Sequence, residues 1–181
     1  MQDRGTFIDW LLPYALEWEK QTGIPAAVFL AIAASESNFG AAPTLFGIKG
    51  PSPSGASAPF PTFEVVDGVP TPTTDTFAVY NTPDEAFQHF MSLISQGRYA
   101  SAWQAFQQSG NWQALLADLQ DAGYATDPEW PAKIVALAQE MGGSPMTQPA
   151  QQSSMGPTPD ALLSGANPIG EPLPEGTKVE V

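Results

Sequence analysis

The chain contains no cysteine, which excludes a disulfide framework, a thiolate metal site and a cysteine nucleophile. Basic residues are also few, since six lysines and arginines face 19 acidic residues and the formal net charge is −13. Such a chain has no electrostatic attraction for nucleic acid or for an anionic membrane surface. A single histidine leaves too few ligands for a metal site, and we expect neither a metal nor another cofactor.

Long hydrophobic runs are absent as well. No segment approaches the roughly 18 consecutive apolar residues that a membrane-spanning helix needs. The first 20 residues also lack the basic region followed by an apolar core that marks a secretory signal peptide. We therefore expect no membrane span and see no signal peptide. A target outside the cytoplasm then implies a mature form, a piece of a longer chain, or delivery by other machinery.

Proline is abundant, and its distribution predicts how the chain is organised. Eight of the 19 prolines fall in residues 43–83 and seven fall in residues 144–181. The second group lies in a Pro/Gly-rich stretch without helical or strand periodicity, which is typical of an extended linker. The sequence thus predicts one folded domain over residues 1–143 and a C-terminal tail over 144–181. We expect this tail to dock to a protein partner in a larger assembly.

The folded part is predicted to be mainly helical. Apolar residues at helical spacing indicate six helices, which start near residues 6, 25, 83, 99, 112 and 128. The third has the form of a capping box, with Thr82 followed by Pro83 and Glu85. Residues 62–81 contain two β-prone runs around a turn-rich middle and predict a small hairpin.

Glu36 is the unusual residue of the predicted second helix, residues 25–40. Val28, Ile32 and Glu36 follow i, i+4, i+8 spacing, so the carboxyl group lies on an apolar stripe. Burial and the negative end of the helix dipole would both raise its pKa. A carboxyl group that stays protonated near neutral pH can act as a general acid, as in glycosidases. The alternative is a solvent-facing glutamate at a helix end.

Several motifs in order carry a resemblance to a known family. Glu36 is followed by Ser37, by Phe39 and Gly40, and later by the stretches LFGIKG, TFE, FAVY and AGYATDP. This series resembles the glucosaminidase domain of glycoside hydrolase family 73 over residues 6–141. The resemblance implies an α+β, mainly α fold, with a lysozyme-like helical body and a small β-hairpin lobe beside a cleft. It also implies hydrolysis of the β-1,4 bond after N-acetylglucosamine in bacterial peptidoglycan, outside the cytoplasm at the wall or in the periplasm.

The resemblance further implies which residues form the catalytic site. Glu36 matches the general acid, and Tyr124 in AGYAT matches a tyrosine that faces the cleft near that acid. Glu64 in TFE is the candidate for a second carboxylate, with Asp67 and Asp75 in reserve. Each has a plain alternative: hairpin or turn charges for the three acids, and a structural role for the tyrosine. The second carboxylate could activate a water, giving inversion, or the substrate's own acetamido group could attack.

Four residues are predicted to contact the substrate. Phe39 stands where the family commonly has tryptophan, and its ring could serve as a platform for a sugar. The other three, Phe46, Ile48 and Tyr80, are expected to line the cleft floor, although each could equally be a core residue. The family often has arginine where Ala78 stands, so this part of the cleft departs from the pattern.

Three functions are consistent with the sequence. The first is peptidoglycan hydrolysis with Glu36 as general acid. The second is a weakly active or inactive glycan-binding part of a phage virion or an envelope assembly, to which the tail would dock. The third is lytic transglycosylation, which cleaves the same polymer but forms an anhydro sugar.

Overall fold

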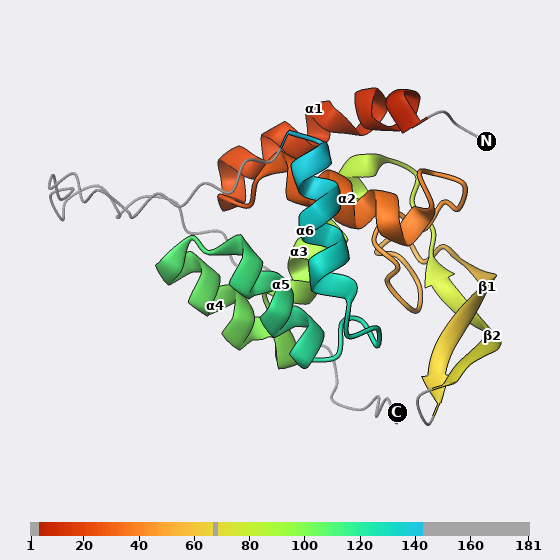
Figure 1. Ribbon diagram of the computed structural model, residues 1–181. Coiled ribbons are helices and arrows are strands. Elements are labelled where there is room, and N and C mark those ends of the chain that lie inside the picture. Colours follow the sequence, from red (N-terminus) through yellow and green to blue (C-terminus); the bar gives the residue numbers. More distant parts are fainter. Residues whose placement is uncertain (1–3, 67–68, 143–181) are drawn as a thin grey trace, which may run out of the picture. The chain divides into compact units, whose positions relative to one another are not determined.

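A computed structural model describes residues 4–66 and 69–142 (Figure 1). The described residues form a helical body and one two-stranded antiparallel sheet, which confirms the predicted α+β, mainly α fold. The elements are α1 (Arg4–Thr22), α2 (Ala26–Ser37), β1 (Ser57–Val66), β2 (Val69–Ala78), α3 (Pro83–Ile94), the 3₁₀ helix η1 (Gly97–Tyr99), α4 (Ala100–Ser109), α5 (Trp112–Asp121) and α6 (Trp130–Glu140). The predicted tail over residues 144–181 and the candidate Asp67 lie outside the described residues.

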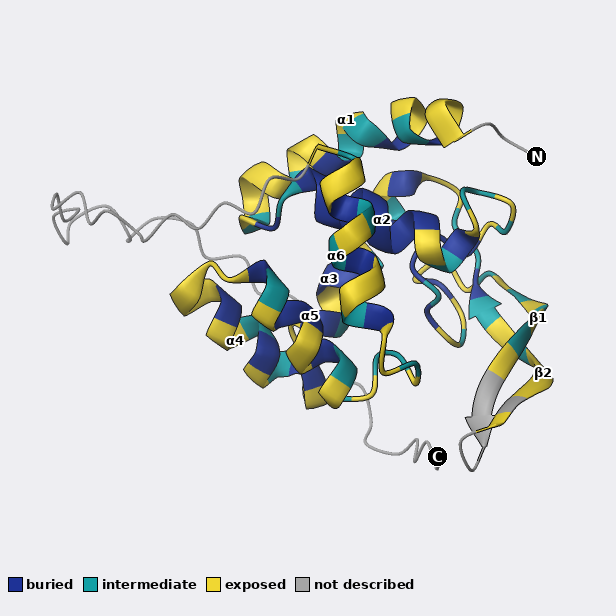
Figure 2. Ribbon diagram, viewed as in Figure 1, coloured by how far each residue is buried: buried dark blue, intermediate teal, exposed yellow. Residues whose placement is uncertain are grey.

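Helix α2 is the centre of the body. Ten of its twelve residues are buried, so it is enclosed on nearly all sides, as its continuous apolar sequence predicts. Figure 2 shows it as the most consistently buried helix, with α1 and α6 packed against it. A carboxyl group near the end of such a helix is held in a fixed place by the packing around it.

Aromatic rings fill the space between α2 and α3. Phe46 stacks on Phe90 with ring centroids 4.7 Å apart, and it meets Phe87 edge-on at 5.1 Å. Phe29 of α2 packs against the same two rings of α3. Since paired rings contribute stabilisation beyond the area they bury, this cluster fixes the chain after α2 onto the helical body.

Helix α3 begins at Pro83, as predicted. The Thr82 hydroxyl oxygen accepts a hydrogen bond from the Glu85 backbone N–H at 3.2 Å, which is the first half of a capping box. The second half differs, because the Glu85 carboxylate accepts from the backbone N–H groups of Asn81 and Ser54, each at 3.0 Å. Glu85 therefore ties the loop before the hairpin to the start of α3.

The hairpin is longer than predicted, because the turn-rich middle of the sequence forms most of β2. Val66 pairs with Val69, and the ladder runs back to Ser57 opposite Ala78. Four prolines of the hairpin lie in every second pair of the ladder. The pairs are Pro59–Thr76, Pro61–Thr74, Phe63–Pro72 and Val65–Pro70. One class of alternate pairs in an antiparallel ladder exchanges no backbone hydrogen bonds. A two-stranded sheet consists of edges alone, so prolines confined to that class cost it no ladder bond.

Candidate active site

Glu36 lies in the last turn of α2, and its side chain is half-buried. The helix ends at Ser37, three residues before the predicted end at Gly40. Asn38 and Phe39 adopt left-handed backbone conformations with φ of 48° and 53°, and the Asn38 N–H bonds to the Ala34 carbonyl. A bulky residue in this conformation is uncommon. The chain therefore leaves the helix one residue after Glu36, and the segment that follows turns back to the Glu36 carboxyl group.

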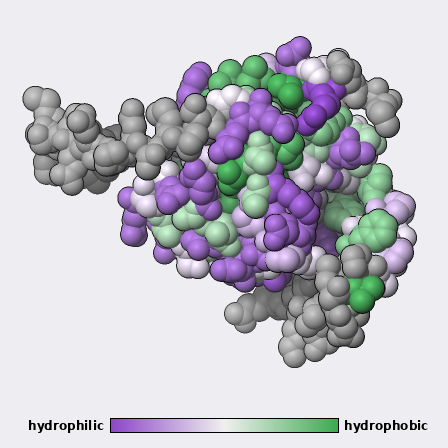
Figure 3. Space-filling view, viewed as in Figure 1, coloured by the Kyte–Doolittle hydropathy of each residue, from purple (hydrophilic) through white to green (hydrophobic). Residues whose placement is uncertain are grey.

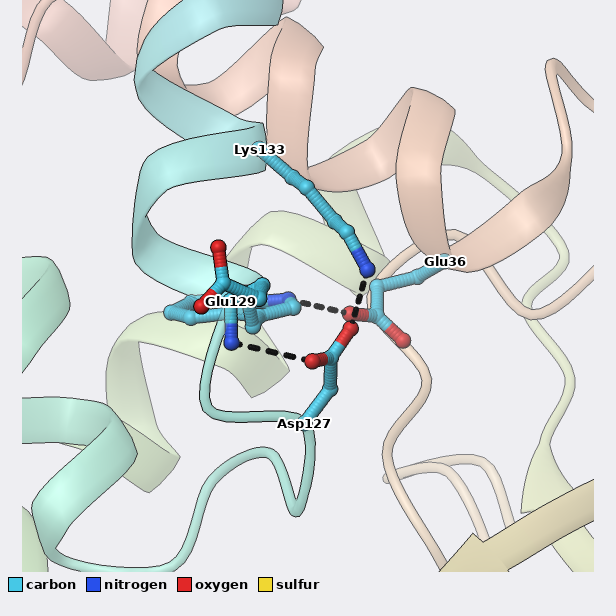
Figure 4. Close-up of polar contacts among 5 residues, drawn as sticks. Glu36, Asp127, Glu129 and Lys133 are labelled. Carbon is cyan, nitrogen blue, oxygen red and sulfur yellow. Dashed lines mark hydrogen bonds and ion pairs between the residues drawn. The ribbon is translucent and has the colours of Figure 1, made fainter. Parts of the chain in front are cut away.

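Two residues far apart in the sequence contact the Glu36 carboxyl group. The Trp130 indole N–H donates a hydrogen bond to Oε1 at 2.9 Å (Figure 4). On the other side, Gly47 approaches so closely that a Cβ atom there would lie 2.5 Å from Oε2. Burial raises the pKa of Glu36 above its ordinary value, and the bond from Trp130 opposes part of that rise. The site thus favours a protonated carboxyl group that is fixed in orientation.

The turn before α6 carries Trp130 to this position. An Asp127 carboxylate oxygen accepts from the Glu129 N–H at 2.9 Å, and the Asp127 carbonyl accepts from the Trp130 N–H at 3.0 Å. The second carboxylate oxygen pairs with the Lys133 ammonium group (Figure 4). The motif GYATDP therefore forms an ordered turn that leads into α6, where the Trp130 indole contacts Glu36.

A pocket of about 140 Å³ opens beside the carboxyl group, between the helical body and the hairpin. Its lining residues are Glu36, Ala42, Thr44 and Gly47 from the body side, and Phe60, Pro61, Thr62 and Phe77 from the hairpin. Figure 3 shows the face on which the hairpin stands beside the body, with the surface hollowed between them. Glu36 is the one ionisable group among these lining residues, so the pocket brings a single proton donor to whatever occupies it.

The segment LFGIKG joins the acid to the hairpin. Gly47 packs against Glu36, and the following residues pair with β2 through the bonds Ala78 N–H to Ile48 carbonyl at 2.8 Å and Gly50 N–H to Thr76 carbonyl at 2.9 Å. These backbone bonds fix the base of the hairpin relative to Glu36.

The candidates for a second carboxylate fall in different surroundings. Glu64 lies in β1 opposite Thr71, and its side chain is outside the described part of the structure, as is Asp67. Asp75 lies in β2, with a carboxylate oxygen 2.7 Å from the Lys49 ammonium nitrogen. Hydrogen bonding from Lys49 is the main reason that the pKa of Asp75 is lowered. Asp75 is therefore held ionised in an ion pair.

Tyr124 lies near the acid but is engaged with the backbone. Its hydroxyl group donates a hydrogen bond to the Phe46 carbonyl at 2.7 Å, and its ring packs against Trp130 with centroids 5.1 Å apart. Burial, and secondarily the nearby Glu36 charge, raise the pKa of Tyr124 well above its ordinary value. The phenol therefore stays protonated and holds the backbone just before Gly47 in place.

The four predicted substrate contacts are divided by the structure. Phe46 is fully buried and Ile48 is 6% exposed, so the structure places both in the core, the alternative that the sequence left open for each. Phe39 is half-buried, with the Arg4 guanidinium 4.3 Å from its ring centroid, which makes it a packing residue at the end of α2. Tyr80 is half-buried and lines a neighbouring pocket.

Two residues of the site were not among those singled out from the sequence. Trp130 fits the apolar stripe of the last helix and so reads as core, and its hydrogen bond to Glu36 is what distinguishes it from other buried rings. Gly47 is one of several glycines, and its proximity to Glu36 depends on how LFGIKG folds back. The sequence signal that could have identified them was their motifs, since Gly47 lies in LFGIKG and Trp130 follows GYATDP.

No group of three or more potential metal ligands is found among residues 4–66 and 69–142. In the same part of the chain, no helix has the length and apolar character to cross a membrane.

Comparison with known proteins places this site in a family. A family model described as glucosaminidase, mannosyl-glycoprotein endo-beta-N-acetylglucosaminidase, matches residues 12–143. The chain is 31% identical over 147 residues to the peptidoglycan hydrolase FlgJ of Pseudomonas aeruginosa, covering 75% of this chain and 36% of that protein. It is 29% identical over 149 residues to the exo-glucosaminidase LytG of Bacillus subtilis, covering 77% and 52%. The chain therefore spans less than two thirds of the length of these relatives.

Solved structures agree with the sequence comparison. The chain matches a peptidoglycan hydrolase mutant from Sphingomonas sp. A1 with a TM-score of 0.63 and 27% identity, over 75% of this chain and 92% of that one. It matches a truncated glycoside hydrolase domain of Salmonella typhimurium FlgJ with a TM-score of 0.56 and 28% identity, over 77% and 98%.

These neighbours and the site define the protein as a lysozyme-like glycoside hydrolase domain, with a helical body, a small hairpin and a glutamate at the end of the central helix. Because the family model covers most of the folded part, the chain belongs to the glucosaminidase family, glycoside hydrolase family 73. The resemblance stated from the motifs is thereby confirmed.

Proposed function

We propose that this chain hydrolyses the β-1,4 bond after N-acetylglucosamine in peptidoglycan, with Glu36 as the general acid. The observation that carries the proposal is the half-buried Glu36 carboxyl group, held by Trp130 at the wall of a pocket between body and hairpin. Family membership supports the reaction, and the names of the two curated relatives, a peptidoglycan hydrolase and an exo-glucosaminidase, support the substrate.

Burial shifts Glu36 toward the protonated state that the reaction needs. Glycoside cleavage requires an acid that protonates the leaving oxygen as the anomeric carbon gains positive charge. A carboxyl group of ordinary pKa has lost its proton near neutral pH, whereas burial raises the pKa of Glu36. The Trp130 N–H is bonded to Oε1, so Oε2, on the side of Gly47, is the oxygen that delivers the proton.

Glu64 is the second carboxylate in this proposal. Phe60, Pro61 and Thr62 of β1 line the pocket, and Glu64 follows two residues further along the same strand. Asp75 is disfavoured as the base because its ion pair with Lys49 lowers its pKa, which weakens it as a proton acceptor.

Two variants separate these carboxylates. If Glu64 activates the attacking water, Glu64→Gln should lower kcat by about 10²–10⁴-fold, and Asp75→Asn should lower it far less. The measurement is the rate of release of soluble fragments from purified peptidoglycan. Near wild-type activity in Glu64→Gln would show instead that the acetamido group of the substrate attacks. Loss confined to Asp75→Asn would assign the base to Asp75.

The pH dependence of the reaction tests the contact between Trp130 and Glu36. Trp130→Phe keeps a ring but removes the N–H donor that lowers the pKa of Glu36. The pKa should rise further, so the loss of kcat/KM that accompanies deprotonation of the acid should occur at higher pH than in the wild type.

Trp112→Phe is the matched control for this measurement. Trp112 is also buried, at 3% exposed against 5% for Trp130, and its indole N–H has no hydrogen-bond partner among the described residues. Trp112→Phe should not change the pH dependence of kcat/KM. An unchanged profile in Trp130→Phe, or one displaced to lower pH, would contradict the assigned role of the indole.

The site of action and the protein partner belong to the same proposal. An enzyme that cleaves peptidoglycan acts outside the cytoplasm, at the wall or in the periplasm. Docking through residues 144–181 and carriage in a phage virion stay predictions, since those residues lie outside the described ones. A net charge of −13 gives the chain no long-range attraction to a wall rich in peptide carboxylates, which supports delivery by a partner.

A further inference from the structure

A second pocket, of about 220 Å³, lies next to the one that contains Glu36. Ala42 lines both, so the two pockets adjoin across the loop that follows α2. The walls come from three separate segments of the chain. They comprise Trp10 of α1, then Gly40, Ala42, Pro43 and Leu45 of the loop, then Tyr80, Asn81, Thr82 and Pro83 before α3.

Trp10 gives this pocket an exposed aromatic wall. It is 44% exposed, although the neighbouring Phe7 and Leu11 of the same helix are fully buried in the core. Its ring packs against Phe7 with centroids 6.1 Å apart, so the indole is held in place on one side and open on the other. A large apolar side chain supported in this way is preorganised to stack against a ligand.

The rest of the lining favours a neutral, amphipathic ligand. Leu45 is 5% exposed and supplies apolar surface, whereas Tyr80, Asn81 and Thr82 supply polar groups. None of the described residues that line the pocket carries a formal charge. A sugar ring has a face of C–H groups and an edge of hydroxyl groups, which matches an indole wall facing polar groups. The carboxylates of a stem peptide would find no cation here.

We propose that this pocket, with Trp10 as its stacking platform, binds an N-acetylhexosamine ring of the same glycan strand that crosses the Glu36 pocket. The inference rests on the proposed function, because that function supplies the strand. The pocket is smaller than the roughly 300–1,000 Å³ of sites for drug-sized ligands, which suits one ring rather than a peptide. The shared residue Ala42 shows that the two pockets adjoin, which binding of neighbouring sugar rings of one strand requires.

The test is a binding titration in the Glu36→Gln background, which keeps the ligand intact. The probes are β-1,4-linked N-acetylglucosamine oligomers of two to six units, followed by tryptophan fluorescence and calorimetry. The affinity should increase with oligomer length until both pockets are filled. Trp10→Ala should remove the gain in affinity that comes from filling the second pocket. Binding of the longest oligomer should therefore weaken by about tenfold. Trp10→Phe should retain most of it.

The controls separate stacking from loss of structure. Leu16→Ala removes another exposed apolar side chain of α1, 45% exposed, that does not line the pocket, and it should bind every oligomer as the parent does. Trp10→Gln repeats the truncation with a residue that also favours helix. Wild-type affinity for all lengths in both Trp10 truncations, or equal weakening by Leu16→Ala, would overturn the inference. Persistent hydrolysis in Glu36→Gln would instead overturn the proposed function, and the titration distinguishes the two results.

Discussion

Glu36→Gln is expected to lower the rate of peptidoglycan hydrolysis by about 10²–10⁴-fold, the contribution typical of a general acid. The glutamine amide cannot protonate the leaving oxygen, yet its Oε1 can still accept the bond from Trp130. The geometry of the site should therefore persist while the chemistry is lost. Activity is measured as release of soluble fragments from purified peptidoglycan. Glu17→Gln, an exposed carboxylate of α1, is the control and should retain full activity.

The same variant should be more stable than the wild type at neutral pH. Burial raises the pKa of Glu36 above 4.5 in the folded chain, so the folded state binds its proton more tightly than the unfolded state does. The free energy of unfolding of the wild type should therefore fall as the pH rises from 4.5 through the raised pKa of Glu36. Glu36→Gln has no titrating group at this position, so its stability should not show this fall. Urea unfolding at pH 4 and at pH 8 measures it. A variant that loses activity together with stability at pH 8 would indicate a damaged fold rather than a missing acid.

Gly47→Ala is expected to have the second-largest effect. The backbone φ at Gly47 is +60°, a conformation that costs a residue with a Cβ atom about 1–2 kcal/mol. The new methyl group would also lie 2.5 Å from Oε2 of Glu36, so the carboxyl group has to move. Displacement of a reacting group by about 1 Å can reduce the rate by about 10²-fold. We therefore expect lower stability, measured by urea unfolding, and a loss of activity of that order.

Gly23→Ala separates the two parts of this effect. Gly23 also has a positive φ, +79°, but a Cβ atom there would meet nothing within 4 Å. The control should show the stability loss from backbone strain with full activity. Equal activity losses in the two variants would mean that the contact between Gly47 and Glu36 is not what matters for the reaction.

The parts of the fold that the sequence predicted are those with strong local signals. The continuous apolar run of α2 and the Thr82 cap of α3 both gave correct elements, because burial and capping depend on nearby residues. Glu36 was singled out because a carboxylate on an apolar stripe breaks a local pattern, and the motifs that follow it carried the resemblance that matches it to a general acid. The hairpin was underestimated, since proline usually argues against strands. Proline at every second pair of this ladder is tolerated because each strand of a two-stranded sheet is an edge strand.

The contacts of the site could not be predicted in this way. Trp130 reaches Glu36 across 94 positions of the chain, and Tyr124 bonds to Phe46 across 78. Such contacts depend on tertiary packing, so the helical and strand periodicity of the sequence does not predict them. Phe46 illustrates the same limit, because an aromatic residue within the motif LFGIKG fits a sugar platform and a core position equally well. In the structure Phe46 is buried and stacked on Phe90, so it is a core residue.

Mass spectrometry of the fragments released from purified peptidoglycan is the decisive test of Glu36-dependent hydrolysis after N-acetylglucosamine. We expect the wild-type chain to release fragments with reducing N-acetylglucosamine ends and Glu36→Gln to release none at the same protein concentration. Anhydro sugar ends would show lytic transglycosylation instead. Absence of release by the intact wild-type chain, with glycan binding retained, would contradict the claim and indicate a binding or structural protein.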